Sequence, residues 1–140
     1  MNIYEKRKSN PIVIMIKSIL SVNGSKAMNY LLQTILEREY HFLAASDVYQ
    51  GMHFLRTNKR ISALVVDLDF QPQQSWSLVE HIKSSKLYKI PVIVLTTANN
   101  ETLRQKCYEF EVDEIFFKPF NPEDLIAAIK SMMTVAIINN

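Results

Sequence analysis

Along this chain, short runs of apolar residues alternate with stretches in which apolar residues recur every three or four positions. The short runs are typical of strands that are buried on both faces of a sheet. The wider spacing is the period of an amphipathic helix. The expected strands are residues 17–22, 41–45, 63–66, 91–95 and 114–117.

Each expected strand is followed by a helical pattern, and several of these helices have a recognisable start. Ser25 precedes the first helix and Ser46 or Asp47 precedes the second, which are residue types that cap helix N-termini. Asn121 and Pro122 mark the start of the last helix. The apolar helix faces consist of Met28, Leu31, Leu32, Ile35 and Leu36, of Val48, Met52 and Leu55, of Leu78, Val79 and Ile82, of Leu103, Cys107 and Phe110, and of Leu125, Ile126, Ile129, Met132 and Met133.

This alternation predicts a three-layer, doubly wound α/β fold of the (βα)5 type, with helices on both faces of a parallel sheet. We expect the domain to span residues 17–133, between an N-terminal leader (1–16) and a C-terminal tail (134–140). The segment Ile12–Ile16 either extends the first strand or packs elsewhere. We expect Leu68–Ser75 to be a loop.

Composition excludes several classes of protein. The 140 residues suffice for one domain, and a content of 48% hydrophobic and 21% charged residues excludes a disordered chain. The net charge of +2 is too small to indicate a nucleic-acid binder. The apolar stretch Ile12–Val22 contains Lys17 and two serines, so it is too short and too polar for a membrane span. We therefore expect a cytoplasmic protein without nucleic-acid or membrane partners.

The cysteine and glycine content narrows the cofactor classes. Cys107 is the single cysteine, which excludes an internal disulfide and a zinc site of several cysteines. Its place on an apolar helix face predicts a buried, inert thiol. The chain has two glycines and no glycine-rich phosphate loop. A small flavodoxin-like cofactor binder is disfavoured, since Asn23-Gly24-Ser25 is too short for such a loop.

In an open parallel sheet, ligands bind outside the carboxyl ends of the strands. The polar residues that close the expected strands are therefore the candidate functional residues. They are Asn23, Gly24, Asp67, Thr96 and Lys118.

Three of these residues lie in segments that resemble the receiver domain of response regulators. ALVVDLDFQP resembles the third strand of that family with its phospho-accepting aspartate, here Asp67. PVIVLTT resembles the fourth strand with its switch hydroxyl, here Thr96. EIFFKPF resembles the fifth strand with its lysine and the proline after it, here Lys118 and Pro119. The order and spacing match over about residues 17–133.

The resemblance implies a CheY-like, flavodoxin-like fold with strand order 2-1-3-4-5 and a cis Lys118–Pro119 bond. It implies a phosphoprotein of a bacterial two-component phosphorelay, in which Asp67 takes a phosphoryl group from phosphohistidine, with no other enzyme activity. Lys118 would neutralise phosphate oxygens and Thr96 would hydrogen-bond one of them. The implied partners are a sensor histidine kinase, a phosphotransfer protein or a second copy of the chain. They would dock on the fourth helix, fifth strand and fifth helix.

One part of the family pattern is missing. Receivers carry an acidic pair after the first strand that holds Mg²⁺, but residues 6–36 contain no Asp or Glu. Asn23 and Gly24 stand at those positions. The remaining candidate metal ligands are Asp67 and Asp69, the latter through the backbone carbonyl that the family uses. We therefore expect weak Mg²⁺ binding and no other cofactor.

Two hypotheses follow from this pattern. In the first, the chain is a single-domain receiver that signals through Asp67 with an impaired metal site. In the second, it is a pseudo-receiver that docks without phosphate, and Lys118 simply pairs with Asp67. Two smaller departures are Ile115, where the family often has an aromatic residue, and Pro72, which comes one position later than usual and predicts a remodelled loop beside the site.

Overall fold

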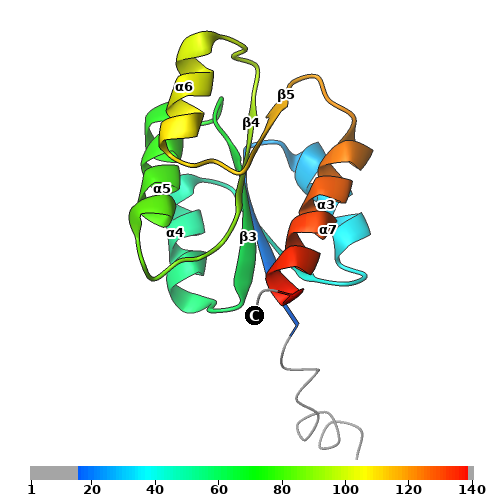
Figure 1. Cartoon of the computed structure of the whole chain (residues 1–140). Helices are drawn as coiled ribbons and strands as arrows, with labels where there is room; N and C mark the ends of the chain where they lie inside the picture. The colour runs from blue at the N-terminus through cyan, green and yellow to red at the C-terminus, as the bar shows by residue number, and fades with distance from the viewer. Residues whose placement is uncertain (1–15, 139–140) are drawn as a thin grey trace, which may run out of the picture.

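The computed structural model describes residues 16–138, which form one five-stranded parallel sheet with helices on both faces (Figure 1). The strand order is β2-β1-β3-β4-β5, which confirms the predicted topology. Helices α3 and α7 cover one face, and α4, α5 and α6 cover the other. The strands are β1 (Ser18–Val22), β2 (His41–Ala45), β3 (Ile61–Asp67), β4 (Val92–Thr96) and β5 (Glu114–Phe117), and the helices are α3 (Lys26–Leu36), α4 (Val48–Thr57), α5 (Pro72–Ser84), α6 (Glu101–Glu109) and α7 (Pro122–Ile138).

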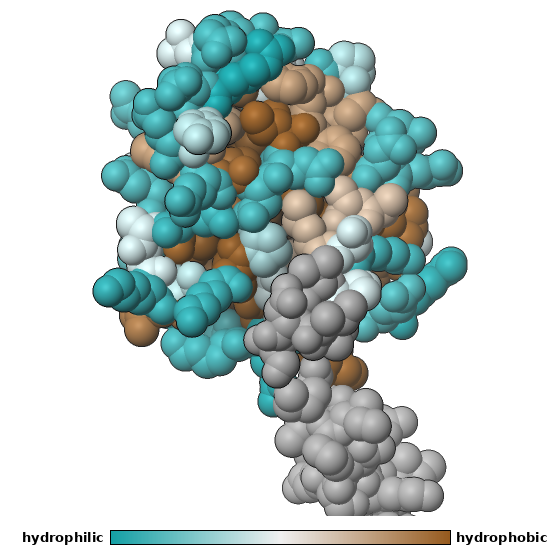
Figure 2. All heavy atoms as spheres, in the orientation of Figure 1, coloured by the Kyte–Doolittle hydropathy of each residue, from teal (hydrophilic) through white to brown (hydrophobic). Residues whose placement is uncertain are grey.

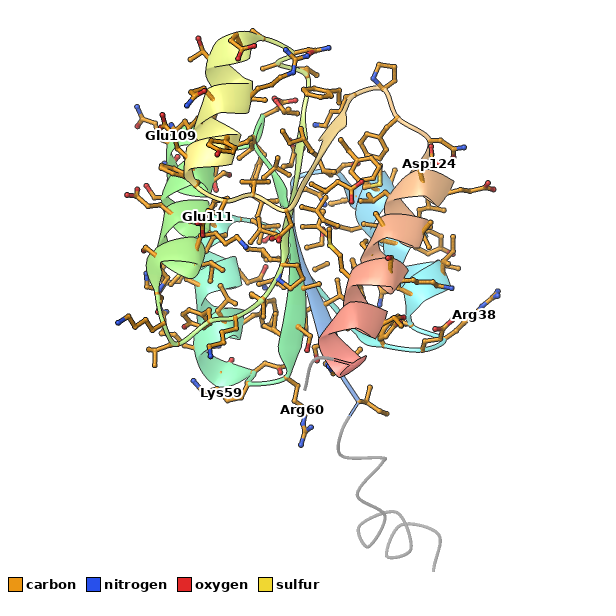
Figure 3. All side chains as sticks on the ribbon, in the orientation of Figure 1. Arg38, Lys59, Arg60, Glu109, Glu111 and Asp124 are labelled. Atoms are coloured by element: carbon orange, nitrogen blue, oxygen red, sulfur yellow. The ribbon has the colours of Figure 1, made fainter. Side chains whose placement is uncertain are left out.

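The sheet separates two apolar layers, which explains why its strands read as continuous apolar runs. Side chains of consecutive strand residues point to opposite faces, so Leu64 packs in the layer under α4, α5 and α6 while Val65 packs in the layer under α3 and α7. Charged side chains such as Arg38, Lys59 and Glu109 point outward (Figure 3).

The structure confirms the predicted start of α3, and it decides between the two cap residues, Ser46 and Asp47, that the sequence left open for α4. The Ser25 hydroxyl caps α3 by accepting the Met28 N–H at 3.1 Å. At α4, Asp47 is the cap, because its carboxylate accepts the Gln50 N–H at 2.7 Å. Both caps satisfy N–H groups that have no partner within the helix.

The loop after β3 is shorter than the predicted Leu68–Ser75, and that prediction was wrong. Gln71 adopts a left-handed conformation with φ 47°, and α5 begins at the next residue, Pro72. Proline suits the first helical position because its φ is already fixed near the helical value. Strand β3 in turn extends through Asp67, so the sheet itself holds the backbone of this aspartate.

Two residues singled out in the sequence have packing roles. Cys107 is free and 2% exposed, as expected for a buried thiol, and burial raises its pKa. Ile115 is half-buried against the apolar layer under α4, α5 and α6.

The ends of the domain lie near the limits of the described residues. Helix α7 runs through Ile138, past residue 133, where the sequence pattern placed the end of the domain. Residues 1–15, which include most of the Ile12–Ile16 segment, and residues 139–140 lie outside the described part of the chain.

Candidate functional site

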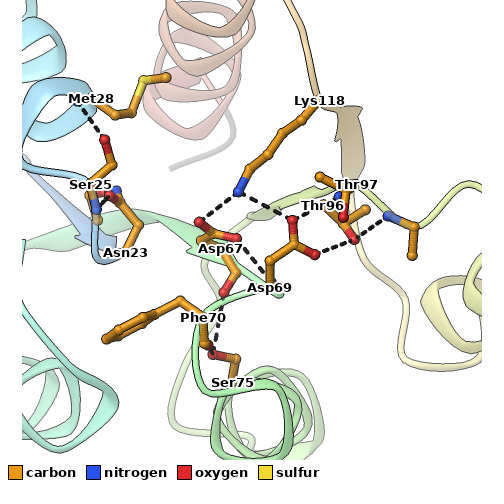
Figure 4. Close-up of polar contacts among 12 residues, drawn as sticks. Asn23, Ser25, Met28, Asp67, Asp69, Phe70, Ser75, Thr96, Thr97 and Lys118 are labelled. Carbon is orange, nitrogen blue, oxygen red and sulfur yellow. Dashed lines mark hydrogen bonds and ion pairs between the residues drawn. The ribbon is translucent and has the colours of Figure 1, made fainter.

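The carboxyl ends of β3, β4 and β5 bring three of the candidate residues together. Asp67 is the last residue of β3, Thr96 is the last residue of β4, and Lys118 directly follows β5. Strand β4 pairs with both of the other strands in parallel, so the three ends meet at one edge of the sheet. Asp67 is 8% exposed and Thr96 is 1% exposed, which makes this a partly enclosed polar cluster (Figure 4).

Lys118 is the cation of the cluster. Its Nζ lies 2.8 Å from Asp67 Oδ2 and 3.3 Å from Asp69 Oδ2. Its backbone N–H donates to the Thr96 carbonyl at 2.8 Å, and the Lys118–Pro119 peptide bond is cis, as the resemblance implied. Partial burial opposes the charged form, but the hydrogen bonds and charges of the two aspartates outweigh it and raise the pKa of Lys118. The lysine is therefore held in its charged form between two carboxylates.

Asp69 turns its side chain toward β4 and β5. Its Oδ1 accepts the Thr96 hydroxyl at 3.1 Å, and its Oδ2 accepts the Thr97 N–H at 2.8 Å. Burial alone would raise the pKa of Asp69, but the Thr97 N–H, Lys118 and the Thr96 hydroxyl together lower it. The sequence pointed to the backbone carbonyl of this residue, and its side-chain contacts were not foreseen.

The end of β1 is neutral and tightly hydrogen-bonded. Asn23 is 2% exposed, and its amide nitrogen donates to Ser21 Oγ and to Asn29 Oδ1, both at 2.8 Å. Its side-chain oxygen accepts the Ser25 N–H at 2.8 Å. Both polar atoms of the Asn23 side chain therefore shape the turn from β1 into α3, and sequence reasoning missed its partners Ser21 and Asn29.

Gly24 packs against the loop that follows β3. A Cβ atom on this residue would lie 2.9 Å from Cδ1 of the Phe70 ring, closer than real Cβ contacts. The Phe70 N–H in turn donates to the Asp67 carbonyl at 3.3 Å. Phe70 thus fills space at the second of the two positions where the family carries its acidic pair.

These groups fit a strong Mg²⁺ site poorly. A hollow of about 310 Å³ lies beside Asp67 and Asn23, and Lys118 also lines it. Mg²⁺ prefers carboxylate oxygens in octahedral geometry. Among the described residues, Asp67 is the only carboxylate that lines the hollow, and an ammonium already lies 2.8 Å from it. Within residues 16–138 no group of three or more His, Cys, Asp or Glu side chains is placed to hold a metal ion.

The comparisons with known proteins agree with this geometry. Residues 19–130 match the family described as the response regulator receiver domain. The chain belongs to this family. Receiver domains are modules of two-component signalling.

Individual relatives are distant. The receiver is 29% identical over 119 residues to hybrid signal transduction histidine kinase D of Dictyostelium discoideum, which covers 84% of this chain and 8% of that protein. It is 27% identical over 120 residues to response regulator GtcR of Aneurinibacillus migulanus, covering 85% of this chain and 48% of that protein. The chain thus spans about half or less of the length of these curated relatives.

Solved structures support the same fold. A CheY-like receiver domain protein from Methanospirillum hungatei superposes with a TM-score of 0.77 at 21% identity, covering 89% of this chain and 99% of that one. The Mn²⁺-bound form of response regulator Rcp1 superposes with a TM-score of 0.68 at 28% identity, covering 83% and 91%. Among the described residues, no helix has the length and apolar character needed to cross a membrane.

Proposed function

We propose that this receiver signals in the cytoplasm by docking onto proteins of a two-component phosphorelay, and that Asp67 accepts a phosphoryl group inefficiently. The observation that carries the proposal is the cluster at the sheet edge. Asp67 lies at the end of β3 with the Lys118 ammonium 2.8 Å away, and the Thr96 hydroxyl closes the adjacent strand. A carboxylate nucleophile, a fixed cation and a hydroxyl are three of the groups that support phosphoryl transfer to aspartate.

The chemistry is one displacement at phosphorus. An Asp67 carboxylate oxygen forms a bond to the phosphorus of a phosphohistidine, the P–N bond breaks, and its electron pair returns to the imidazole, which takes up a proton. Lys118 neutralises phosphoryl oxygens as charge shifts. Outside this reaction on its own aspartate, the receiver is not an enzyme in this proposal.

The same reaction is expected to be slow because the β1 end supplies no negative charge. Asn23 and Gly24 stand where receivers carry their acidic pair, and Asn23 is fully engaged by Ser21, Ser25 and Asn29. Weak Mg²⁺ binding follows, since one carboxylate and neutral oxygens compete poorly with water for this ion. Asp67 is therefore an acceptor with an impaired metal site.

The docking surface in this proposal consists of α6, β5 and α7. Strand β5 is an edge strand in which no residue is fully buried. Figure 2 shows apolar residues reaching the surface between α6 and α7, inside a hydrophilic rim. The Arg104 guanidinium lies 5.5 Å from the centre of the Phe117 ring, and Tyr108 is 81% exposed. Aromatic and arginine side chains are enriched at protein interfaces, which favours a protein partner such as a histidine kinase, a phosphotransfer protein or a second copy.

A second candidate function is a pseudo-receiver that docks without phosphate. The ion pair of Lys118 with Asp67 favours it, because this pair gives both residues a structural role without any chemistry. The two candidates share the docking surface and differ only in whether Asp67 is modified.

Incubation with Mg²⁺ and acetyl phosphate, followed by intact-mass measurement, tests the proposal. We expect a slow, partial phosphoryl adduct that Asp67→Asn abolishes. An adduct that persists in Asp67→Asn would place the acceptor elsewhere. The absence of any adduct in folded protein would leave the pseudo-receiver as the better account.

A further inference from the structure

Three hydrogen-bond donors from two neighbouring strand ends converge on the carboxylate of Asp69. Lys118 Nζ, after β5, lies 3.3 Å from Oδ2. Thr96 Oγ1, at the end of β4, lies 3.1 Å from Oδ1, and the Thr97 N–H donates to Oδ2 at 2.8 Å. An ammonium, a hydroxyl and a backbone N–H around one point form an oxyanion-binding pocket.

The turn after β3 delivers Asp69 to this pocket. The Asp69 N–H donates to Asp67 Oδ1 at 2.9 Å, and the Phe70 N–H donates to the Asp67 carbonyl at 3.3 Å. These bonds fix the backbone so that the Asp69 side chain projects beside the Asp67 carboxylate, toward β4 and β5 (Figure 4). Lys118 consequently contacts both carboxylates.

Thr96 and Thr97, two of the three donors of the pocket, are already fully used. The Thr96 hydroxyl has a single proton, which it gives to Asp69, while its oxygen accepts the Ala98 N–H at 3.0 Å. The Thr97 N–H is likewise used once. A phosphoryl group on Asp67 would need the same ammonium and would bring about −1.5 to −2 of charge beside the Asp69 carboxylate. Phosphoryl oxygens and Asp69 therefore compete for one pocket.

We propose that Asp69 is a built-in occupant of this oxyanion pocket, in the place that phosphoryl oxygens on Asp67 would take. Its carboxylate holds Thr96 and the Thr97 backbone in the anion-bound arrangement without phosphate, and it shields Asp67 from phosphodonors. The inference rests on the proposed function only where it takes Asp67 as the acceptor. Because residues 97–100 connect the pocket to α6, the internal anion orders one edge of the docking surface.

Inorganic phosphate is the direct probe, because it needs neither a kinase nor a metal ion. Backbone amide NMR signals of Thr96 and Thr97 are followed while phosphate is added to the full chain. We expect no saturable shift in the unaltered chain and saturable shifts in Asp69→Ala, whose pocket is vacant. Asp69→Asn keeps the shape but loses the charge and should fall between the two.

Glu80→Gln is the matched control. It neutralises an exposed carboxylate on α5, away from the pocket, and should respond to phosphate like the unaltered chain. Two results would overturn the proposal. One is a saturable phosphate shift at Thr97 in the unaltered chain, and the other is the absence of such a shift in both Asp69 variants while their spectra show folded protein.

Labelling by acetyl phosphate separates this inference from the proposed function. Asp69→Ala should gain the Asp67 adduct roughly tenfold faster than the unaltered chain, the factor that ~1.4 kcal/mol represents. Equal labelling rates in both forms would contradict the shielding role of Asp69. If no form is labelled, the acceptor role of Asp67 fails, whereas the phosphate titration still decides whether Asp69 fills the pocket.

Discussion

Lys118 Nζ lies 2.8 Å from Asp67 Oδ2, and this ion pair joins the ends of β3 and β5 across β4. The pair is partly enclosed, with 30% of the lysine side chain and 11% of the aspartate side chain exposed. Enclosed ion pairs matter to stability chiefly because removing one partner leaves the other charge buried without a counter-charge. The same contact therefore serves the fold and, in the proposed function, holds the cation that would meet phosphoryl oxygens.

Removal of the lysine charge tests this dual role. Lys118→Met keeps most of the aliphatic stem but leaves Asp67 and Asp69 without their cation. We expect a loss of about 1–3 kcal/mol in the free energy of unfolding, the usual cost of an unsatisfied polar group. Urea denaturation at neutral pH measures it.

Lys130→Met is the matched control for that variant. Lys130 pairs with Glu39 at 3.1 Å, but the two side chains are 39% and 53% exposed. Exposed pairs contribute about 0–1 kcal/mol, so this variant should unfold at nearly the urea concentration of the unaltered chain. Equal losses in the two variants would contradict a special role for Lys118.

The lowered pKa of Asp69 predicts a pH-dependent contribution to stability. A carboxyl whose folded-state pKa lies below its unfolded value stabilises the fold above the unfolded pKa, and this contribution is lost as pH falls through the folded pKa. Asp69→Asn should therefore be less stable than the unaltered chain near neutral pH. The difference should shrink as pH falls below about 4, the ordinary value for aspartate. Urea midpoints measured across this range check it, and a difference that is constant with pH would contradict it.

A carboxylate at position 23 should restore part of the metal site. Asn23→Asp loses the amide donors to Ser21 and Asn29, so we expect a loss of about 1–3 kcal/mol without metal. Added Mg²⁺ should raise the Tm of this variant more than that of the unaltered chain, since a second carboxylate then faces the hollow.

Asn100→Asp is the control for this metal effect. Asn100 caps α6 through its side-chain oxygen, which an aspartate can replace without creating a metal site. Its Tm should respond to Mg²⁺ as the unaltered chain does. If Mg²⁺ shifts both variants alike, the missing acidic pair does not explain weak metal binding.

The contact of Gly24 with Phe70 predicts coupling between these positions. Gly24→Ala should cost about 1–3 kcal/mol, because its new Cβ would lie 2.9 Å from the Phe70 ring. Gly24→Ala combined with Phe70→Ala should lose less stability than the sum of the two single variants. A double-mutant cycle in urea measures this, and simple additivity would contradict a steric origin.

The sequence predicted the topology because the physical signals were strong. The runs 63–66 and 91–95 are typical of strands buried on both faces, and parallel strands place their carboxyl ends together. The convergence of Asp67, Thr96 and Lys118 follows from that rule alone. The start of α5 was misplaced because the left-handed conformation of Gln71 has no sequence signal as strong as a glycine.

The contacts of Asp69 and Asn23 could not be predicted in the same way. The direction of the Asp69 side chain depends on the turn after β3 and on donors that lie 27 and 28 residues away. The Asn23 network depends on Asn29 in the first turn of α3, which reads in the sequence as an ordinary polar helix position. Polar contacts across elements are set by tertiary structure, which periodicity does not report.

Transfer from a phosphorylated histidine phosphotransfer protein tests the central claim most directly. The unaltered chain and Asp67→Asn are mixed with the donor and Mg²⁺, and loss of the donor phosphoryl group is followed together with the intact mass of the receiver. The account predicts slow transfer to the unaltered chain and none to Asp67→Asn. Equal transfer to both chains, or none to the folded unaltered chain from phosphotransfer proteins that label other receivers, would contradict it.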